Sequence, residues 1–174
     1  MRSLSIEERV KLAQKGDEEA FSTLIYEKKE TLYVTAYSYV KNKEDALDIV
    51  QETVYKAYKN IKKLKEAKFF NTWLTRILIN VAIDYVKKNN KVIYLADDAE
   101  RNLKVEENRE EIIDIQRAIG NLSENLKTII ILKYYQNFTC EEISQTIQMP
   151  IGTVKTNLHK ALKALRVDFK EELL

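Results

Sequence analysis

Residues 139–166 read TCEEISQTIQMPIGTVKTNLHKALKALR, and this stretch predicts two helices joined by a short turn. Thr139 has the side chain of a helix N-cap, and the two glutamates that follow favour the positive end of a helix. Pro150 lacks a backbone donor, so we expect the first helix to stop there. The second helix places its apolar side chains on one face, which comprises Val154, Leu158, Ala161, Leu162 and Leu165.

The opposite face of the second helix is basic and rich in short polar side chains. Short polar groups reach base edges in the major groove, and lysines hold phosphates. Two helices with this pattern are typical of a helix-turn-helix. A surface helical hairpin with solvated lysines is the alternative, and the run GTVK after the turn favours DNA over it. The face carries Thr153, Lys155, Thr156, Asn157, His159, Lys160 and Lys163.

The composition predicts an all-α protein, because three glycines and one proline in 174 residues leave few places to break a helix. Charged residues make up 32% of the chain, but the net charge is only +2. A nucleic-acid role must therefore come from how the charge is distributed. A single cysteine, Cys140, excludes an internal disulfide and a cysteine-cluster zinc site, and a single histidine makes a histidine-based metal site equally unexpected.

The sequence offers no sign of membrane insertion, export or catalysis. No apolar run approaches the roughly 20 residues needed to cross a bilayer. The first 21 residues are too charged for a signal peptide, so we expect a cytoplasmic protein. We find no nucleophile–base pair, metal cluster or phosphate-binding loop, and we therefore expect neither enzymatic activity nor a cofactor.

Residues 1–91 are expected to form four helices. A capping box at residues 5–8 opens the first, which ends near Gln14, and the second spans residues 18–39. The third, over residues 45–61, reads DALDIVQETVYKAYKNI. Its predicted core stripe comprises Leu47, Val50, Val54, Ala57 and Ile61. Its predicted exposed face comprises Asp45, Asp48, Gln51 and Glu52, which either confers solubility or docks a basic partner helix.

Six lysines within residues 56–68 precede the fourth helix, and residues 62–68 are expected to form a loop. The fourth helix, over residues 69–91, repeats Trp73, Ile77, Val81 and Tyr85 at helical spacing and ends in lysines. Lysines at a helix C-terminus are mildly stabilising in themselves. Basic clusters that flank aromatic rings nevertheless suit single-stranded DNA. Taken one at a time, Phe69, Phe70 and Trp73 are expected in the core.

The helical pattern is lost after residue 91. Residues 92–114 contain eight acidic and three basic residues, which predicts an extended linker. Helical periodicity returns with Ile112, Ile115 and Ile119, and Ser123 starts the helix before the helix-turn-helix. We therefore expect two small helical domains, residues 1–91 and 110–174, joined by an acidic linker over residues 92–109.

Three stretches in this order resemble an extracytoplasmic-function (ECF) sigma factor of the sigma-70 family. Residues 45–58 resemble the family's helix that docks on the β′ clamp helices of RNA polymerase. Residues 69–91 resemble the segment that recognises and opens the −10 promoter element, and residues 122–166 resemble the −35-binding domain. The resemblance implies a factor that binds core RNA polymerase and directs promoter-specific initiation. It also implies that the acidic linker threads towards the active site and RNA exit channel of polymerase.

The resemblance gives individual residues roles. Asn80 and Asp84 match the family's N-x-x-x-D, and residues 62–68 lie where ECF factors cradle a flipped −10 base. Trp73-Leu74 replaces a pair of aromatics found in housekeeping relatives, which implies weaker strand opening. The implied contacts are Leu47, Asp48, Gln51 and Glu52 for core polymerase; Lys62, Lys63, Lys65, Lys68, Asn80, Asp84, Lys87 and Lys88 for the −10 element; and Thr153, Lys155, Thr156, Asn157, His159 and Lys160 for the −35 element.

Two other functions compete with this interpretation. A stand-alone helix-turn-helix regulator would need a dimer interface and a palindromic operator. A structural adaptor would use the acidic face alone and leave GTVK, the lysine clusters and the linker unexplained. The resemblance also implies inhibition by an anti-sigma factor, which in this family is often membrane-anchored.

Overall fold

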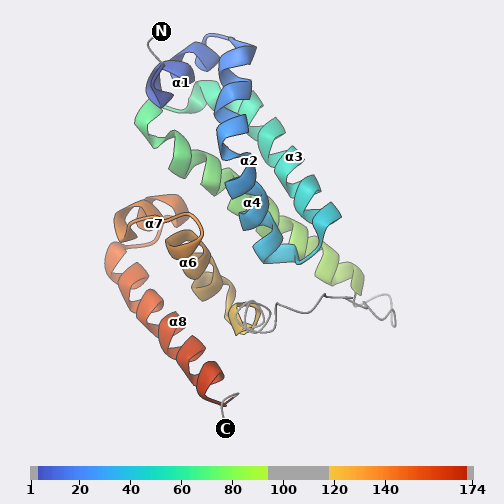
Figure 1. Ribbon diagram of the computed structural model, residues 1–174, viewed down its shortest axis with the longest axis vertical. Coiled ribbons are helices and arrows are strands. Elements are labelled where there is room, and N and C mark those ends of the chain that lie inside the picture. The colour runs from blue at the N-terminus through green and yellow to red at the C-terminus, as the bar shows by residue number, and fades with distance from the viewer. Residues whose placement is uncertain (1–3, 94–117, 172–174) are drawn as a thin grey trace. The chain divides into compact units, whose positions relative to one another are not determined.

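The structure, a computed structural model, describes residues 4–93 and 118–171, and within these ranges it is helical with no strand (Figure 1). The predicted all-α fold is confirmed. Residues 94–109 of the predicted linker lie outside the described ranges. The chain divides into two compact units. The first contains α1 (Ile6–Gln14), α2 (Glu18–Val40), α3 (Lys43–Asn60) and α4 (Phe70–Ile93) up to Tyr85; the second contains α6 (Glu124–Tyr134), most of α7 (Cys140–Ile147) and α8 (Ile151–Glu171).

The first unit begins with the predicted capping box. The backbone N–H of Ser5 donates to Glu8 Oε2 at 2.8 Å, and the N–H of Glu8 donates to Ser5 Oγ at 3.2 Å. After α1 the chain turns at Gly16, whose φ of 102° suits glycine. Asp17 then caps α2 by accepting from the N–H of Ala20 at 2.9 Å. α1 packs on α2, and α2 packs along α3 (Figure 1).

The core stripe predicted for α3 is correct at Ala57 and Ile61, which are buried, and wrong at Leu47, which is 50% exposed. The buried residues of α3 are Ala46, Ile49, Thr53 and Ala57. Both stripes have helical spacing, so periodicity could not choose between them. The observed stripe contains two alanines, whose small side chains allow close helix packing, and Thr53 satisfies its buried hydroxyl by donating to the carbonyl of Ile49 at 2.7 Å. Leu47, Val50 and Val54 are left exposed or only partly buried.

Between α3 and α4 the chain forms two short 3-10 turns, η1 (Ile61–Lys63) and η2 (Ala67–Phe69). α4 then runs to Ile93, beyond the predicted end at Lys91. Its fully buried side chains include Phe70, Leu74 and Leu78. Trp73 and Tyr85, which were placed on the predicted repeat, are only partly buried. Phe70 thus lies in the core as expected, while Phe69 and Trp73 do so only in part.

The second unit confirms the helix-turn-helix. Thr139 and Glu142 form a capping box, with N–H to side-chain distances of 2.8 and 3.1 Å. α7 ends at Ile147, and Gln148 adopts a left-handed φ of 54°. The helix therefore stops before Pro150, whose carbonyl instead accepts the first bond of α8, from Val154 N–H. The apolar face of α8 packs as predicted, with Ala161 buried against Ile119 and Ile130 and with Leu158, Leu162 and Leu165 around them.

Candidate protein and nucleic-acid interfaces

The four residues predicted to contact polymerase lie together on one exposed face of α3. Leu47 is 50% exposed, and Asp48, Gln51 and Glu52 are also exposed. Glu52 forms a surface pair with Lys56 at 3.3 Å, which contributes little to stability. Asp45, predicted on the same face, instead accepts a hydrogen bond from the Tyr85 hydroxyl at 2.7 Å, and this bond joins α3 to α4.

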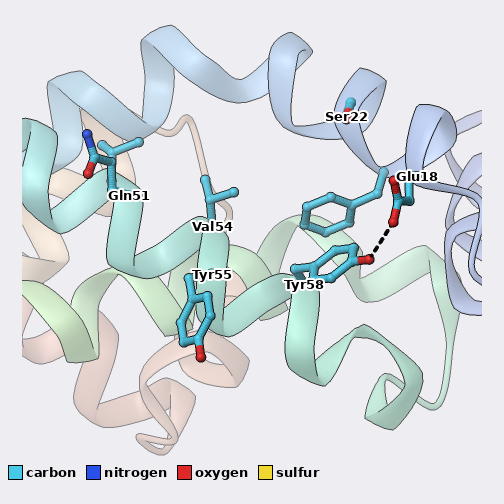
Figure 2. Close-up of a pocket in the computed structure, with 8 residues that line it drawn as sticks. Glu18, Ser22, Gln51, Val54, Tyr55 and Tyr58 are labelled. Atoms are coloured by element: carbon cyan, nitrogen blue, oxygen red, sulfur yellow. Dashed lines mark hydrogen bonds between the residues drawn. The ribbon is translucent and has the colours of Figure 1, made fainter.

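An open groove of about 540 Å³ lies between α2 and α3 and includes Gln51 (Figure 2). Val50 and Val54, which were expected in the core, line it instead. At one end the Tyr58 hydroxyl donates to Glu18 Oε1 at 3.1 Å, and this bond raises the pKa of Tyr58. The other lining residues are Phe21, Ser22 and Tyr55. The face thus combines exposed carboxylates with apolar area, which suits a partner helix carrying basic and apolar side chains.

A second groove, of about 350 Å³, lies between α3 and α4 and is basic. It brings together two of the residues predicted to contact the −10 element, Lys63 and Asn80. Its other lining residues are Lys56, Asn60, Trp73, Ile77 and Val81. Ammonium groups, amides and an indole ring are the groups that bind phosphates, base edges and base faces.

The sequence reasoning did not place Asn60 or Ile77 at this site, it counted Lys56 only in the basic cluster of residues 56–68, and it expected Trp73 in the core. A signal was present, because Lys56, Asn60 and Lys63 recur at helical spacing and would share a face if the helix continued through Lys63. Asn60 Nδ2 donates to the carbonyl of Lys56 at 2.8 Å. That bond fixes the amide at the end of α3, where it borders the groove.

The remaining residues predicted for the −10 element do not line this groove. Lys62 and Lys65, which are close to Lys63 in the sequence, are exposed. Lys68 pairs with Glu66 at 2.9 Å and lies 4.8 Å from the centre of the Phe69 ring. The hydrogen bond to Glu66 raises the pKa of Lys68. Further along α4, three predicted residues are exposed: Asp84, Lys87 and Lys88.

The residues predicted for the −35 element lie on the first three turns of α8. Thr153, Lys155, Thr156, His159 and Lys160 are exposed. The Thr156 hydroxyl donates to the carbonyl of Gly152 at 2.9 Å. Asn157 is half-buried, and its Nδ2 lies 3.5 Å from Sδ of Met149 in the turn before the helix. A single helix therefore presents this whole set.

Two observations concern other kinds of site. Among the described residues, no three His, Cys, Asp or Glu side chains are grouped so that they could hold a metal ion. None of the described helices has both the length and the apolar character needed to cross a membrane.

Comparison with known proteins accounts for both units. The family model described as Sigma-70 region 2 matches residues 25–92, and that described as Sigma-70, region 4 matches residues 112–165. The RNA polymerase sigma factor SigV of Bacillus subtilis is 36% identical over 151 residues, which cover 86% of this chain and 91% of SigV. The ECF RNA polymerase sigma factor SigW of the same organism is 30% identical over 190 residues, covering 97% of this chain and 98% of SigW.

Solved structures support the same fold. CnrH, in complex with the cytosolic domain of CnrY, has a TM-score of 0.78 at 19% identity and covers 95% of this chain and 97% of its own. The sigma factor RpoE of Bartonella quintana, in complex with the anti-sigma factor NepR, has a TM-score of 0.75 at 22% identity, with coverages of 87% and 98%. The chain belongs to the sigma-70 family of RNA polymerase sigma factors, and within it to the ECF group.

Proposed function

We propose that this sigma factor binds core RNA polymerase through the exposed face of α3 and directs initiation at promoters with −35 and −10 elements. The observation that carries the proposal is the exposure of Leu47, Asp48 and Gln51 beside an open apolar groove. An exposed apolar area rimmed by polar and charged residues is typical of a surface that docks a partner protein. The clamp helices of β′ supply the basic, amphipathic partner.

The two promoter elements would be read by different units. α8 would enter the major groove at the −35 element, with Thr153, Thr156 and Asn157 towards base edges and Lys155 and Lys160 towards phosphates. The groove between α3 and α4 would hold the opened −10 strand, with Trp73 offering a ring face to a base. Because both units belong to one chain, binding at one element raises the effective concentration of the other.

The similarity over both units favours this function over a stand-alone dimeric regulator. A sigma factor supplies specificity to the polymerase, so we propose no catalysis and no cofactor for this chain. We also propose that it works in the cytoplasm and that an anti-sigma factor holds it inactive. Support for that partner comes from the sigma factor RpoE of B. quintana, which has the same fold and was solved in complex with the anti-sigma factor NepR.

The test is run-off transcription with core RNA polymerase on a genomic promoter library. Promoter-specific transcripts should depend on this protein and disappear with Asp48→Arg, because an arginine there repels basic clamp helices. Glu30→Arg makes the same charge change at another exposed site, on α2, and should leave transcription intact. If the wild-type protein gave no transcripts and did not co-purify with core polymerase, the sigma function would be refuted, and dimeric operator binding would be tested next.

A further inference from the structure

Gln14, the last residue of α1, reaches across the first unit to the turn after α3. Its side-chain nitrogen, Nε2, donates to the carbonyl of Ile61 at 3.0 Å and to the carbonyl of Leu64 at 2.7 Å. These acceptors lie 47 and 50 residues away in sequence, at the start of η1 and directly after its end. One side chain therefore bridges both ends of η1.

The helix that carries Gln14, α1, is held in place by contacts within the first unit. α1 starts with the capping box at Ser5 and is tied to α2 by Arg9, whose guanidinium donates to both oxygens of Glu27 at 2.6 and 3.0 Å. Val10 and Ala13 of α1 are buried. Gln14 is the last residue of α1, so its backbone is held by the helix and by these contacts.

The acceptors flank Lys63, one of the two lysines that line the groove between α3 and α4. Ile61 and Leu64 are buried, at 3% and 8% exposure, and the N–H of Leu64 donates to the carbonyl of Ile61 at 3.1 Å. The two residues between them, Lys62 and Lys63, are exposed. Lys63 lines the groove with Trp73 and Asn80. The direction in which these lysines point is therefore set by the turn that Gln14 bridges.

The chemistry of this bridge requires a primary amide. An amide nitrogen carries two N–H donors, which matches two carbonyl acceptors. Methionine has a similar length but no donor, and glutamate would place a carboxylate against two carbonyl oxygens. Gln14 lies outside the segment matched by the region 2 model, which begins at residue 25.

We propose that Gln14 is a positioning residue for the −10 interface. Gln14 holds η1 so that Lys63 faces the groove that it lines together with Trp73 and Asn80. The proposal rests on the proposed function of that groove. A positioning role predicts that loss of the bridge weakens binding of the opened −10 strand and leaves docking on core polymerase unchanged.

The structural part of the proposal is tested by amide hydrogen exchange on the free protein. Gln14→Met should speed exchange of the Leu64 N–H by about tenfold, because η1 loses two hydrogen bonds at its ends. Lys11→Met is the matched control, since it introduces the same side chain at an exposed position of α1 and leaves the amide of Gln14 and the Arg9–Glu27 pair intact. Equal exchange in the wild type and Gln14→Met, or the same increase in Lys11→Met, would overturn the proposal.

The functional part is tested with holoenzyme on a fork-junction oligonucleotide that carries a single-stranded −10 element. Gln14→Met and Gln14→Glu should bind it about tenfold more weakly than wild type, with unchanged affinity for core polymerase. Lys11→Met should bind it as wild type does. If wild-type holoenzyme does not bind the fork, the proposed function of the groove fails and the inference with it. If wild type and both Gln14 variants bind equally, the inference alone fails.

Discussion

The two candidate DNA interfaces of this protein are built in different ways. The −35 interface lies on consecutive turns of one helix, α8, whose opposite, apolar face packs against Ile119 and Ile130. The −10 groove is composite, because its lining comes from α3, η1 and α4. In addition, Gln14 of α1 donates hydrogen bonds to the carbonyls at both ends of η1. An interface on one helix depends mainly on local sequence, whereas a composite groove depends on contacts between segments far apart in the chain.

The largest effect is expected from charge reversal on α8. Lys155→Glu together with Lys160→Glu should lower transcription from a −35-dependent promoter by about 100-fold, because two phosphate contacts become repulsive. The measurement is run-off transcription at fixed salt, and fork binding at the −10 element should stay within a factor of about two. The matched control is Lys11→Glu with Lys43→Glu, at two exposed lysines of the first unit. Equal losses in both double variants would mean that bulk charge alone matters.

An effect of about tenfold is expected from Trp73→Ala in the composite groove, because stacking of a base on an aromatic ring contributes about 1–3 kcal/mol. Permanganate reactivity of the opened promoter measures it. Trp73 also packs against Phe70, with ring centres 6.0 Å apart, so the affinity for core polymerase is measured in parallel to detect a folding defect. Trp73→Phe keeps a ring face and should retain most of the opening. An alanine variant that opens the promoter as well as wild type would argue against stacking.

The smallest effects are expected from the two capping boxes. Ser5→Ala and Thr139→Ala should each lower the free energy of unfolding by about 1 kcal/mol. Trp73 is the single tryptophan of the chain, so its fluorescence in urea reports on the first unit alone. Its midpoint should fall with Ser5→Ala and stay constant with Thr139→Ala, whereas circular dichroism should detect both changes. A fluorescence shift with Thr139→Ala would show that the units do not unfold independently.

The capping box at Ser5 and Glu8 also makes the free energy of unfolding depend on pH. Hydrogen bonds from Ser5 lower the pKa of Glu8 below its ordinary value. A lowered folded-state pKa contributes stability above the unfolded-state value, and this contribution is lost as the pH falls through the folded-state pKa. The difference in the free energy of unfolding between wild type and Ser5→Ala should therefore become smaller as the pH falls.

The sequence predicted correctly those features whose side chains all lie within one short segment. The capping box at Ser5, the N-cap at Thr139 and the apolar face of α8 follow from side chains three or four residues apart. The prediction failed where two faces of one helix could each be buried. In α3 the stripe through Leu47 and the stripe through Ala46 have the same period, and the packing of α3 in the first unit selects the second.

The sequence by itself determined that this protein is all-α, that it ends in a helix-turn-helix and that it resembles ECF sigma factors, because these features depend on local patterns and their order. The tertiary structure decided which apolar face of α3 is buried, that Lys56 and Trp73 share a groove with Asn80, and that Gln14 bridges η1. Such contacts join residues up to 50 positions apart. They arise from close packing of specific side-chain shapes, which the period of a hydrophobic pattern does not encode.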